Sequence, residues 1–245
     1  MRGLPKINAG YWLTLMAAST FGTNTGDFVS DTLHIGHLAG LPWLALALGL
    51  VFSIERWSAW ANPLFFWLVI IIVRTAATNV GDAFHDFDIG FGTSLPLVLA
   101  LFTASVAAYA RFSPRRSGDD AASVRVSPLY WLCMGMAGIL GTIGGDFMSF
   151  GAHLSPAGTA IAFSALAAAA IIYWGRDGRL YQPAYYWIAL ALIRTAGTGA
   201  GDALAHDVFG LPLATVATGL VFLGLVGYFY LLKKDNQSLA TLAAT

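Results

Sequence analysis

The sequence predicts an all-α membrane protein with eight transmembrane helices. They would form four parallel two-helix repeats about a twofold or fourfold pseudo-axis along the membrane normal. Three observations predict this fold class. Hydrophobic residues make up 57% of the 245 residues and charged residues only 11%, whereas charged residues make up about a quarter of a soluble domain. The mean hydropathy is +0.68. A Thr-x-x-Gly-Asp motif also occurs four times, always within or at the end of an apolar segment.

Each predicted helix is an apolar segment close to the roughly 20 residues that a membrane span requires. Every lysine and arginine except Arg74 and Arg194 lies before the first segment, after the eighth, or between an even-numbered segment and the next odd-numbered one. The other connections contain no lysine or arginine, so the positive-inside rule predicts that both termini are cytoplasmic. The segments are 9–31, 38–54, 60–86, 92–110, 128–151, 156–174, 183–207 and 211–232.

Histidines and acidic residues gather at the opposite, outer ends of these segments. Ordinary polar capping of helix ends could explain any one of them, whereas the asymmetry of the whole set is harder to explain in this way. The set comprises His34, His37, His85, His153 and His206 together with Asp31, Asp86, Asp88 and Asp207.

A tryptophan precedes each motif aspartate by fifteen residues. At 1.5 Å per residue this spacing rises about 22 Å along a helix. With the tryptophans near the cytoplasmic interface, the aspartates are predicted to lie in the outer third of a core about 30 Å thick. The pairs are Trp12 and Asp27, Trp67 and Asp82, Trp131 and Asp146, and Trp187 and Asp202.

A second level of repetition divides the chain into halves. The segment 74–83 closely matches the segment 194–203, so the second and fourth repeats resemble each other more than either resembles the first or third. The predicted halves are residues 1–120 and 121–245 within one integral membrane domain, and the charged segment 111–121 links them. Because each repeat has two helices, all four repeats share one orientation in the membrane.

These residues resemble a known family. Four tandem two-helix units, each with a marked tryptophan and a Gly-Asp pair, are similar to an uncharacterised family of bacterial integral membrane proteins that is defined by a repeat of unknown function. The resemblance implies a multi-pass helical fold in the bacterial inner (plasma) membrane. It implies no activity.

The motif predicts a polar face on each odd-numbered helix, because residues four and eight apart lie on one side of a helix. Lipid cannot satisfy such a face, so it should line the bundle interior or a water-filled cavity. The motif glycines either allow close helix packing or let the helix unwind to expose carbonyls. The motif threonines either bond to their own helix or act as ligands. The stripes are Ser19, Thr23, Asp27 and Asp31; Arg74, Thr78, Asp82 and Asp86; Gly138, Thr142, Asp146 and Phe150; and Arg194, Thr198, Asp202 and His206.

Four carboxylates that lie close together cannot all stay ionised without cations nearby. Arg74 and Arg194 could neutralise two of them as structural ion pairs, protons could be shared, or a divalent metal could bind. Carboxylate and hydroxyl ligands favour Mn²⁺ or Mg²⁺, and imidazoles extend the range to Fe²⁺, Zn²⁺, Co²⁺ or Ni²⁺. An arginine beside a divalent cation is, however, electrostatically unfavourable.

The leading functional hypothesis is a transporter of a divalent metal cation, which would be either the cargo or a bound ion. The alternatives are a proton-coupled carrier of a small organic or anionic solute, and a non-transporting scaffold or sensor with structural ion pairs. Arg74 and Arg194, with Thr23, Thr78, Thr142 and Thr198, would bind solute or form a gate. The predicted metal ligands are Asp27, Asp82, Asp146, Asp202, Asp31, Asp86, His85, His206 and Asp207.

Other classes of protein fit the sequence less well. It has no Gly-x-Ser-x-Gly, His-Glu-x-x-His or phosphate-loop motif, so no enzymatic activity is expected. A formal net charge of zero gives no reason to expect nucleic acid as a partner. The expected partners are the lipid bilayer and a metal ion or small solute.

Overall fold

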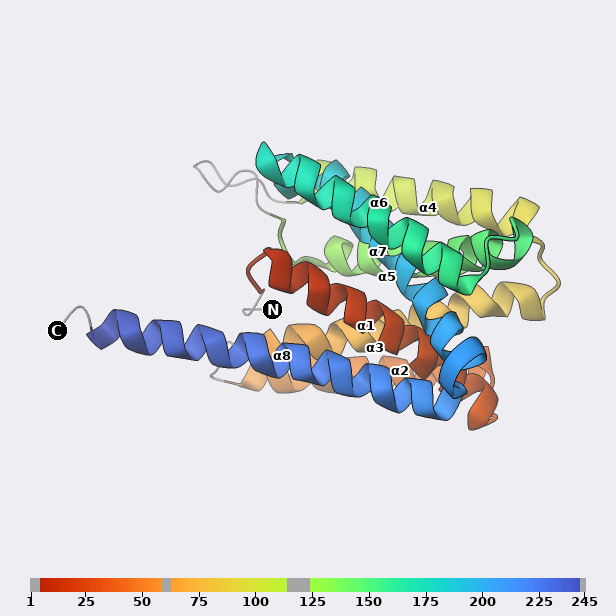
Figure 1. Cartoon of the computed structure of the whole chain (residues 1–245), viewed down its shortest axis with the longest axis horizontal. Helices are drawn as coiled ribbons and strands as arrows, with labels where there is room; N and C mark the ends of the chain where they lie inside the picture. The colour runs from red at the N-terminus through yellow and green to blue at the C-terminus, as the bar shows by residue number, and fades with distance from the viewer. Residues whose placement is uncertain (1–4, 59–62, 114–123, 243–245) are drawn as a thin grey trace.

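The structure is a computed structural model that describes residues 5–58, 63–113 and 124–242. Within these ranges the chain forms eight α-helices and no strand, which confirms the predicted all-α class (Figure 1). Each predicted segment corresponds to one helix, although the eighth continues well past residue 232. The start predicted at residue 60 and the boundary between the halves lie outside the described residues. The helices are α1 (Ala9–Asp27), α2 (His37–Trp57), α3 (Pro63–Asp86), α4 (Phe91–Phe112), α5 (Pro128–Asp146), α6 (Pro156–Arg176), α7 (Pro183–Asp202) and α8 (Leu211–Leu242).

Six of the segments are long and apolar enough to cross a membrane by length and composition. They are α2, α3, α4, α6, the first part of α8, and α5 with the short π-helical segment that follows it. The helices α1 and α7 do not reach this hydropathy. Both lie in the middle of the bundle, where most of their residues are buried and many are glycine, serine or threonine. Because α1 and α7 pack against protein rather than lipid, they can be less apolar than the other helices.

The odd-numbered helices form a closed inner ring. Helix α1 packs against α3, α3 against α5, α5 against α7, and α7 against α1. The even-numbered helices lie outside this ring, with α2 against α3, α4 against α5, α6 against α7 and α8 against α1. Each outer helix thus covers the inner helix of the following repeat, so the repeats interlock and none is packed as a separate hairpin.

Neighbouring inner helices pack closely against each other at the motif glycines. A Cβ added to Gly26 of α1 would lie 2.8 Å from Thr78 of α3, and one added to Gly145 of α5 would lie 2.8 Å from Thr198 of α7. All four glycines lie within α-helices, so they permit close approach and the helices are not unwound there. The same contact runs around the ring in chain order, between Gly26 and Thr78, Gly81 and Thr142, Gly145 and Thr198, and Gly201 and Thr23.

A second layer of close contacts lies one helical turn away. A Cβ on Gly141 of α5 would come within 2.4 Å of the Arg194 Cβ and 2.7 Å of the Arg194 backbone carbon on α7. The remaining contacts follow the same cyclic order, between Gly22 and Arg74, Ala77 and Gly138, and Gly197 and Ser19. Small residues at these positions bring neighbouring helix backbones together, as is common in membrane bundles.

The polar stripe does not continue past the aspartates in the way that the sequence predicts. After Asp27, Asp146 and Asp202 the helix widens into π-helical segments, Phe28–Thr32, Phe147–Gly151 and Ala203–Phe209. Only α3 continues as an α-helix, to Asp86. A wider turn changes which residues share a face. The four-residue spacing therefore aligns Asp86 with Asp82, but it does not hold for Asp31, Phe150 and His206.

Aromatic side chains close one end of the ring. The Tyr11 and Trp12 rings pack edge to face, and Trp12 also packs on Tyr186, with ring centroids 5.2 Å and 5.5 Å apart. Phe66 and Tyr130 complete this buried cluster. It lies at the end of the bundle that carries both termini (Figure 1). The motif aspartates lie toward the opposite end, so the ring interior changes from aromatic to acidic along its length.

Candidate functional site

The interior of the ring is built from layers spaced four residues apart on each inner helix. The residues that precede the motif aspartates by four, eight, twelve and sixteen positions are all buried. Four-residue spacing places them on one helix face. From the acidic end inward the layers are the motif threonines; Ser19, Arg74, Gly138 and Arg194; Leu15, Ile70, Met134 and Leu190; and Tyr11, Phe66, Tyr130 and Tyr186.

Arg74 lies at the centre of the ring and is fully buried. Its Nη2 donates to the hydroxyls of Thr23 and Thr198 at 2.6 Å and 2.7 Å. Its Nη1 donates to the Thr142 hydroxyl at 2.8 Å and to the Gly138 carbonyl at 3.1 Å. Its Nε donates to the Ser19 carbonyl at 3.3 Å. These bonds employ all five N–H groups of the guanidinium and tie α3 to the other three inner helices.

Two of the three threonines that accept hydrogen bonds from Arg74 also bond to backbone carbonyls. The Thr23 hydroxyl donates to the Ser19 carbonyl at 3.0 Å, and the Thr198 hydroxyl lies 3.1 Å from the Gly141 carbonyl and 3.2 Å from that of Arg194. Each of these two hydroxyls thus bonds to its own helix, as one of the two roles considered for the motif threonines requires, and also accepts from the arginine. Thr78 follows Arg74 on the same helix, and its buried hydroxyl has no hydrogen-bond partner.

Arg194 occupies the equivalent position on α7 but is bonded differently. It is also fully buried, and its Nη2 lies 3.1 Å from the Met134 sulfur. Its Nε and Nη1 have no hydrogen-bond partner. The side chain therefore extends toward the aliphatic layer, away from the threonines. The two arginines occupy equivalent positions in the sequence repeats but are not equivalent in the structure.

The motif aspartates surround the outer side of Arg74. Its charge interacts electrostatically with all four of them. The carboxyl groups of Asp27 and Asp82 interact with each other and with that of Asp146, and carboxyl groups that lie so close together cannot all stay ionised without cations nearby. Asp202 is buried and its Oδ2 has no hydrogen-bond partner. The acidic layer thus places like charges close together and leaves one buried carboxyl oxygen without a partner.

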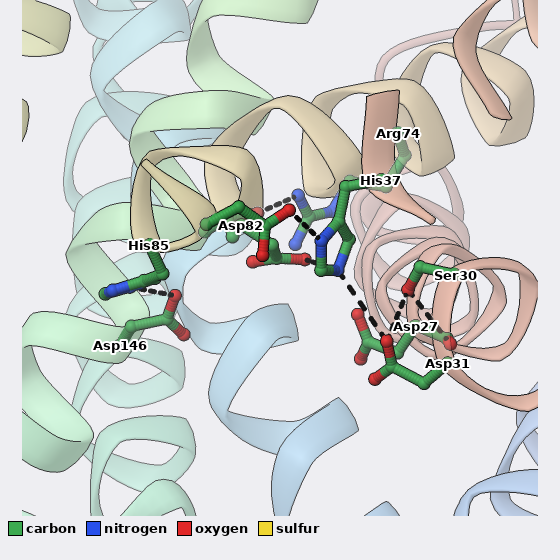
Figure 2. A network of polar contacts seen from close by, with 10 residues as sticks. Asp27, Ser30, Asp31, His37, Arg74, Asp82, His85 and Asp146 are labelled. Atoms are coloured by element: carbon green, nitrogen blue, oxygen red, sulfur yellow. Dashed lines mark hydrogen bonds and ion pairs between the residues drawn. The ribbon is translucent and has the colours of Figure 1, made fainter. Parts of the chain in front are cut away.

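His37, at the start of α2, reaches over this layer (Figure 2). Its Nδ1 lies 2.8 Å from an oxygen of Asp86, and its Nε2 lies 3.8 Å from Asp31 and 3.9 Å from Asp82. On the other side of the ring, the His85 Nε2 lies 3.8 Å from Asp146 (Figure 2). Imidazoles therefore contact the acidic layer from two different elements.

The predicted metal-ligand set is brought together only in part. Asp27, Asp82, Asp146 and Asp202 converge, and Asp31, Asp86 and His85 lie at the rim as more exposed neighbours. His206 and Asp207 are exposed in the π-helical segment after α7. Among the described residues, no group of three histidine, cysteine or acidic side chains has the arrangement of a metal site.

Two further features of the site were not predicted from the sequence. They are the buried Asn24 and Asn79 next to the motif threonines, and the hydroxyl cluster of Tyr11, Tyr130 and Tyr186. The tyrosines could have been found by extending the four-residue stripe two layers further back from Ser19, Gly138 and Arg194. His37 belongs to the outer set of histidines, but it was not among the predicted ligands because it lies on an outer helix with no motif.

Comparison with protein families gives one result. Residues 10–59 and 129–179 match a model described as a Repeat of Unknown Function (DUF347). The matched segments cover α1 with α2 and α5 with α6, so they fall at equivalent places in the two predicted halves. This match confirms the resemblance to a tandem-repeat family. The comparisons with curated proteins and with solved structures give no match.

Proposed function

We propose that this protein is a transporter that couples movement of a small solute to protons. The DUF347 repeat, which residues 10–59 and 129–179 match, has no known function, so this function is inferred from the chain's own residues. The motif aspartates are the proton-binding groups. The observation that carries this proposal is the convergence of the four motif aspartates on the outer side of the buried Arg74, with Asp82 and Asp146 partly exposed. Two interacting carboxyl groups titrate as a pair, so a proton shared between Asp27 and Asp82 can be released or taken up when their surroundings change.

The position of the acidic layer supports this role. The layer faces one end of the ring, and Asp82 and Asp146 keep 20% and 14% of their side-chain surface exposed. Below it, Arg74 and three threonines close the centre of the ring. Protons can thus reach the carboxylates from the outer end, while the arginine layer and the layers beneath it separate them from the other end.

The proposal includes the membrane arrangement. All eight helices cross the inner membrane, with both termini in the cytoplasm and the acidic layer toward the outer face. The cyclic order of the glycine contacts supports a fourfold pseudo-axis along the membrane normal. The occurrence of arginine in only two of the four repeats reduces that symmetry to a twofold one.

Replacing Asp27 and Asp82 together by asparagine should remove the shared proton. In infrared difference spectra of the purified protein, we expect the pH-dependent stretch of a protonated carboxyl group to be largely lost. In proteoliposomes that contain a pH-sensitive dye, proton uptake driven by an outward gradient of solute should fall to the level of protein-free vesicles. Chloride and nitrate are the first solutes to supply, because neither carries protons across lipid efficiently by itself.

Asp88→Asn is the matched control, because Asp88 lies at the same end of the molecule but is exposed outside the ring. It should leave both measurements unchanged. If the double variant kept the carboxyl signal and wild-type proton uptake, the aspartates would be structural and the proposal would be wrong. If the wild-type protein itself showed no protonated carboxyl signal at any pH, the shared proton would be excluded.

Divalent metal transport remains the second candidate, and one observation favours it. His37 lies within 4 Å of three carboxylates, those of Asp31, Asp82 and Asp86. Added Mn²⁺ or Zn²⁺ could draw these groups together, since imidazole and carboxylate are ligands for such ions.

The metal hypothesis predicts that wild-type protein dialysed against Mn²⁺ or Zn²⁺ keeps a stoichiometric amount in elemental analysis. His37→Gln should lower that amount substantially, because it removes the one side chain that contacts all three carboxylates. His34→Gln serves as the control, because His34 is exposed and lies three residues before His37. A wild-type protein that retained no more metal than the His37→Gln variant would contradict this second candidate.

A further inference from the structure

We infer that Arg194 is the binding residue for a small anion, held between the threonine and tyrosine layers of the ring. The inference deepens the proposed function: it names a small anion as the solute, and it rests on that function for the claim that the anion is transported. The binding itself does not depend on proton coupling.

The buried charge of Arg194 is not balanced by a carboxylate. Arg194 is completely buried, and an arginine stays charged in a protein. No ion pair joins it to a carboxylate among the described residues, and the charged group with the largest effect on it is another cation, Arg74. An isolated buried charge is very costly, so buried charges are normally paired. An anion would supply the missing countercharge.

Arg194 also has free hydrogen-bond donors, which Arg74 does not. Arg74 employs all its N–H groups within the ring, whereas Nε and Nη1 of Arg194 have no partner. Buried N–H groups of this kind cost free energy unless something accepts from them. The guanidinium fork of Arg194 is thus free to bind a ligand in a way that the fork of Arg74 is not.

The different directions of the two side chains have a physical reason. The centre of the threonine layer holds one guanidinium, and Arg74 occupies it through Thr23, Thr142 and Thr198. A second cation in the same place would be repelled. Arg194 therefore extends the other way, toward Met134.

The tyrosine layer supplies further hydrogen-bond donors. The hydroxyl of Tyr186 lies 2.5 Å from that of Tyr11 and 2.9 Å from that of Tyr130, and the Tyr11 and Tyr130 hydroxyls are 3.5 Å apart. All three interact electrostatically with Arg194. Hydroxyls can turn their hydrogens toward an anion. Every residue of the layer between them and the arginines is buried, which argues for a small anion such as chloride, nitrate or formate.

The test is an anion titration of the full-length protein in a non-ionic detergent, with gluconate as the starting anion. Adding chloride, nitrate or formate should raise the thermal unfolding midpoint of the wild type in a saturable way, because a ligand that binds the folded state stabilises it. Arg194→Gln should abolish this response. In gluconate alone, its unfolding midpoint should equal or exceed that of the wild type, because the uncompensated charge is gone.

Two milder variants keep the test decisive if Arg194→Gln does not fold. Arg194→Lys should keep a response that saturates at higher anion concentration, and Tyr186→Phe should weaken the response without removing it. Arg179→Gln, at an exposed arginine outside the ring, should respond as the wild type does. A wild type whose midpoint is insensitive to all three anions, or an Arg194→Gln variant that keeps the response, would overturn the inference.

The inference and the proposed function fail in different ways. The variant with both Asp27→Asn and Asp82→Asn should keep the anion response and lose proton uptake. If the wild type binds anion but an anion gradient moves no protons, the proposed function fails and the anion site stands. If protons move while all three anions leave the unfolding midpoint unchanged, the anion site fails and proton coupling stands.

Discussion

Arg74→Lys should destabilise the folded protein by about 3–5 kcal/mol, the range for disrupting a buried, hydrogen-bonded charge. A lysine keeps the charge but has three donors on one nitrogen, whereas Arg74 donates five hydrogen bonds to residues of α1, α5 and α7. Some threonine and carbonyl acceptors would lose their partner, and the buried ammonium would be poorly satisfied. The measurement is the unfolding midpoint in detergent, with size-exclusion chromatography to follow the loss of folded protein.

Arg194→Lys is the matched comparison, because it makes the same change at the repeat-equivalent position of α7. Its cost should be clearly smaller, since the Arg194 guanidinium makes a single hydrogen bond within the described residues, to Met134. Equal losses at the two positions would show that both arginines have the same structural role. Such a result would contradict the division of roles between the central Arg74 and the ligand-binding Arg194.

Gly141→Ala should have the second large effect, because it adds one carbon where α5 touches α7. The new Cβ would lie 2.4 Å from the Arg194 Cβ and 2.7 Å from its backbone carbon. A backbone atom cannot move aside as a side-chain tip can, so the helices must separate. Overpacking of this kind costs about 1–3 kcal/mol, and here it also disturbs the arginine layer. Unfolding in detergent should report a lower midpoint.

Gly49→Ala provides the control for this substitution. Gly49 lies within α2, and a Cβ there would have no atom within 4 Å. Alanine is favoured over glycine inside a helix by about 1 kcal/mol, so this variant should be as stable as the wild type or slightly more so. If Gly141→Ala were tolerated as well as Gly49→Ala, the close-packed ring would not be the source of stability that the contacts indicate.

Much of the fold follows from periodicity along the chain. Apolar segments of the length of a membrane span identify the eight helices, and the four-residue spacing from Thr23 to Asp27 and its three counterparts predicts a shared polar interior. Both are local properties, because the geometry of an α-helix decides which residues share a face. The spacing fails only where the helix widens after Asp27, Asp146 and Asp202, and the local sequence did not reveal these π-helical turns.

The sequence by itself determined the helices, their repeats and the four aspartates on one inward face. Only the tertiary structure decided that each motif glycine packs on the threonine of the next repeat, that His37 reaches the acidic layer from an outer helix, and that the two arginines differ. The physical reason is competition for a shared space. Equivalent residues on separate helices have the same local sequence context, but the centre of the ring admits one guanidinium, so Arg74 fills it and Arg194 is left with free donors.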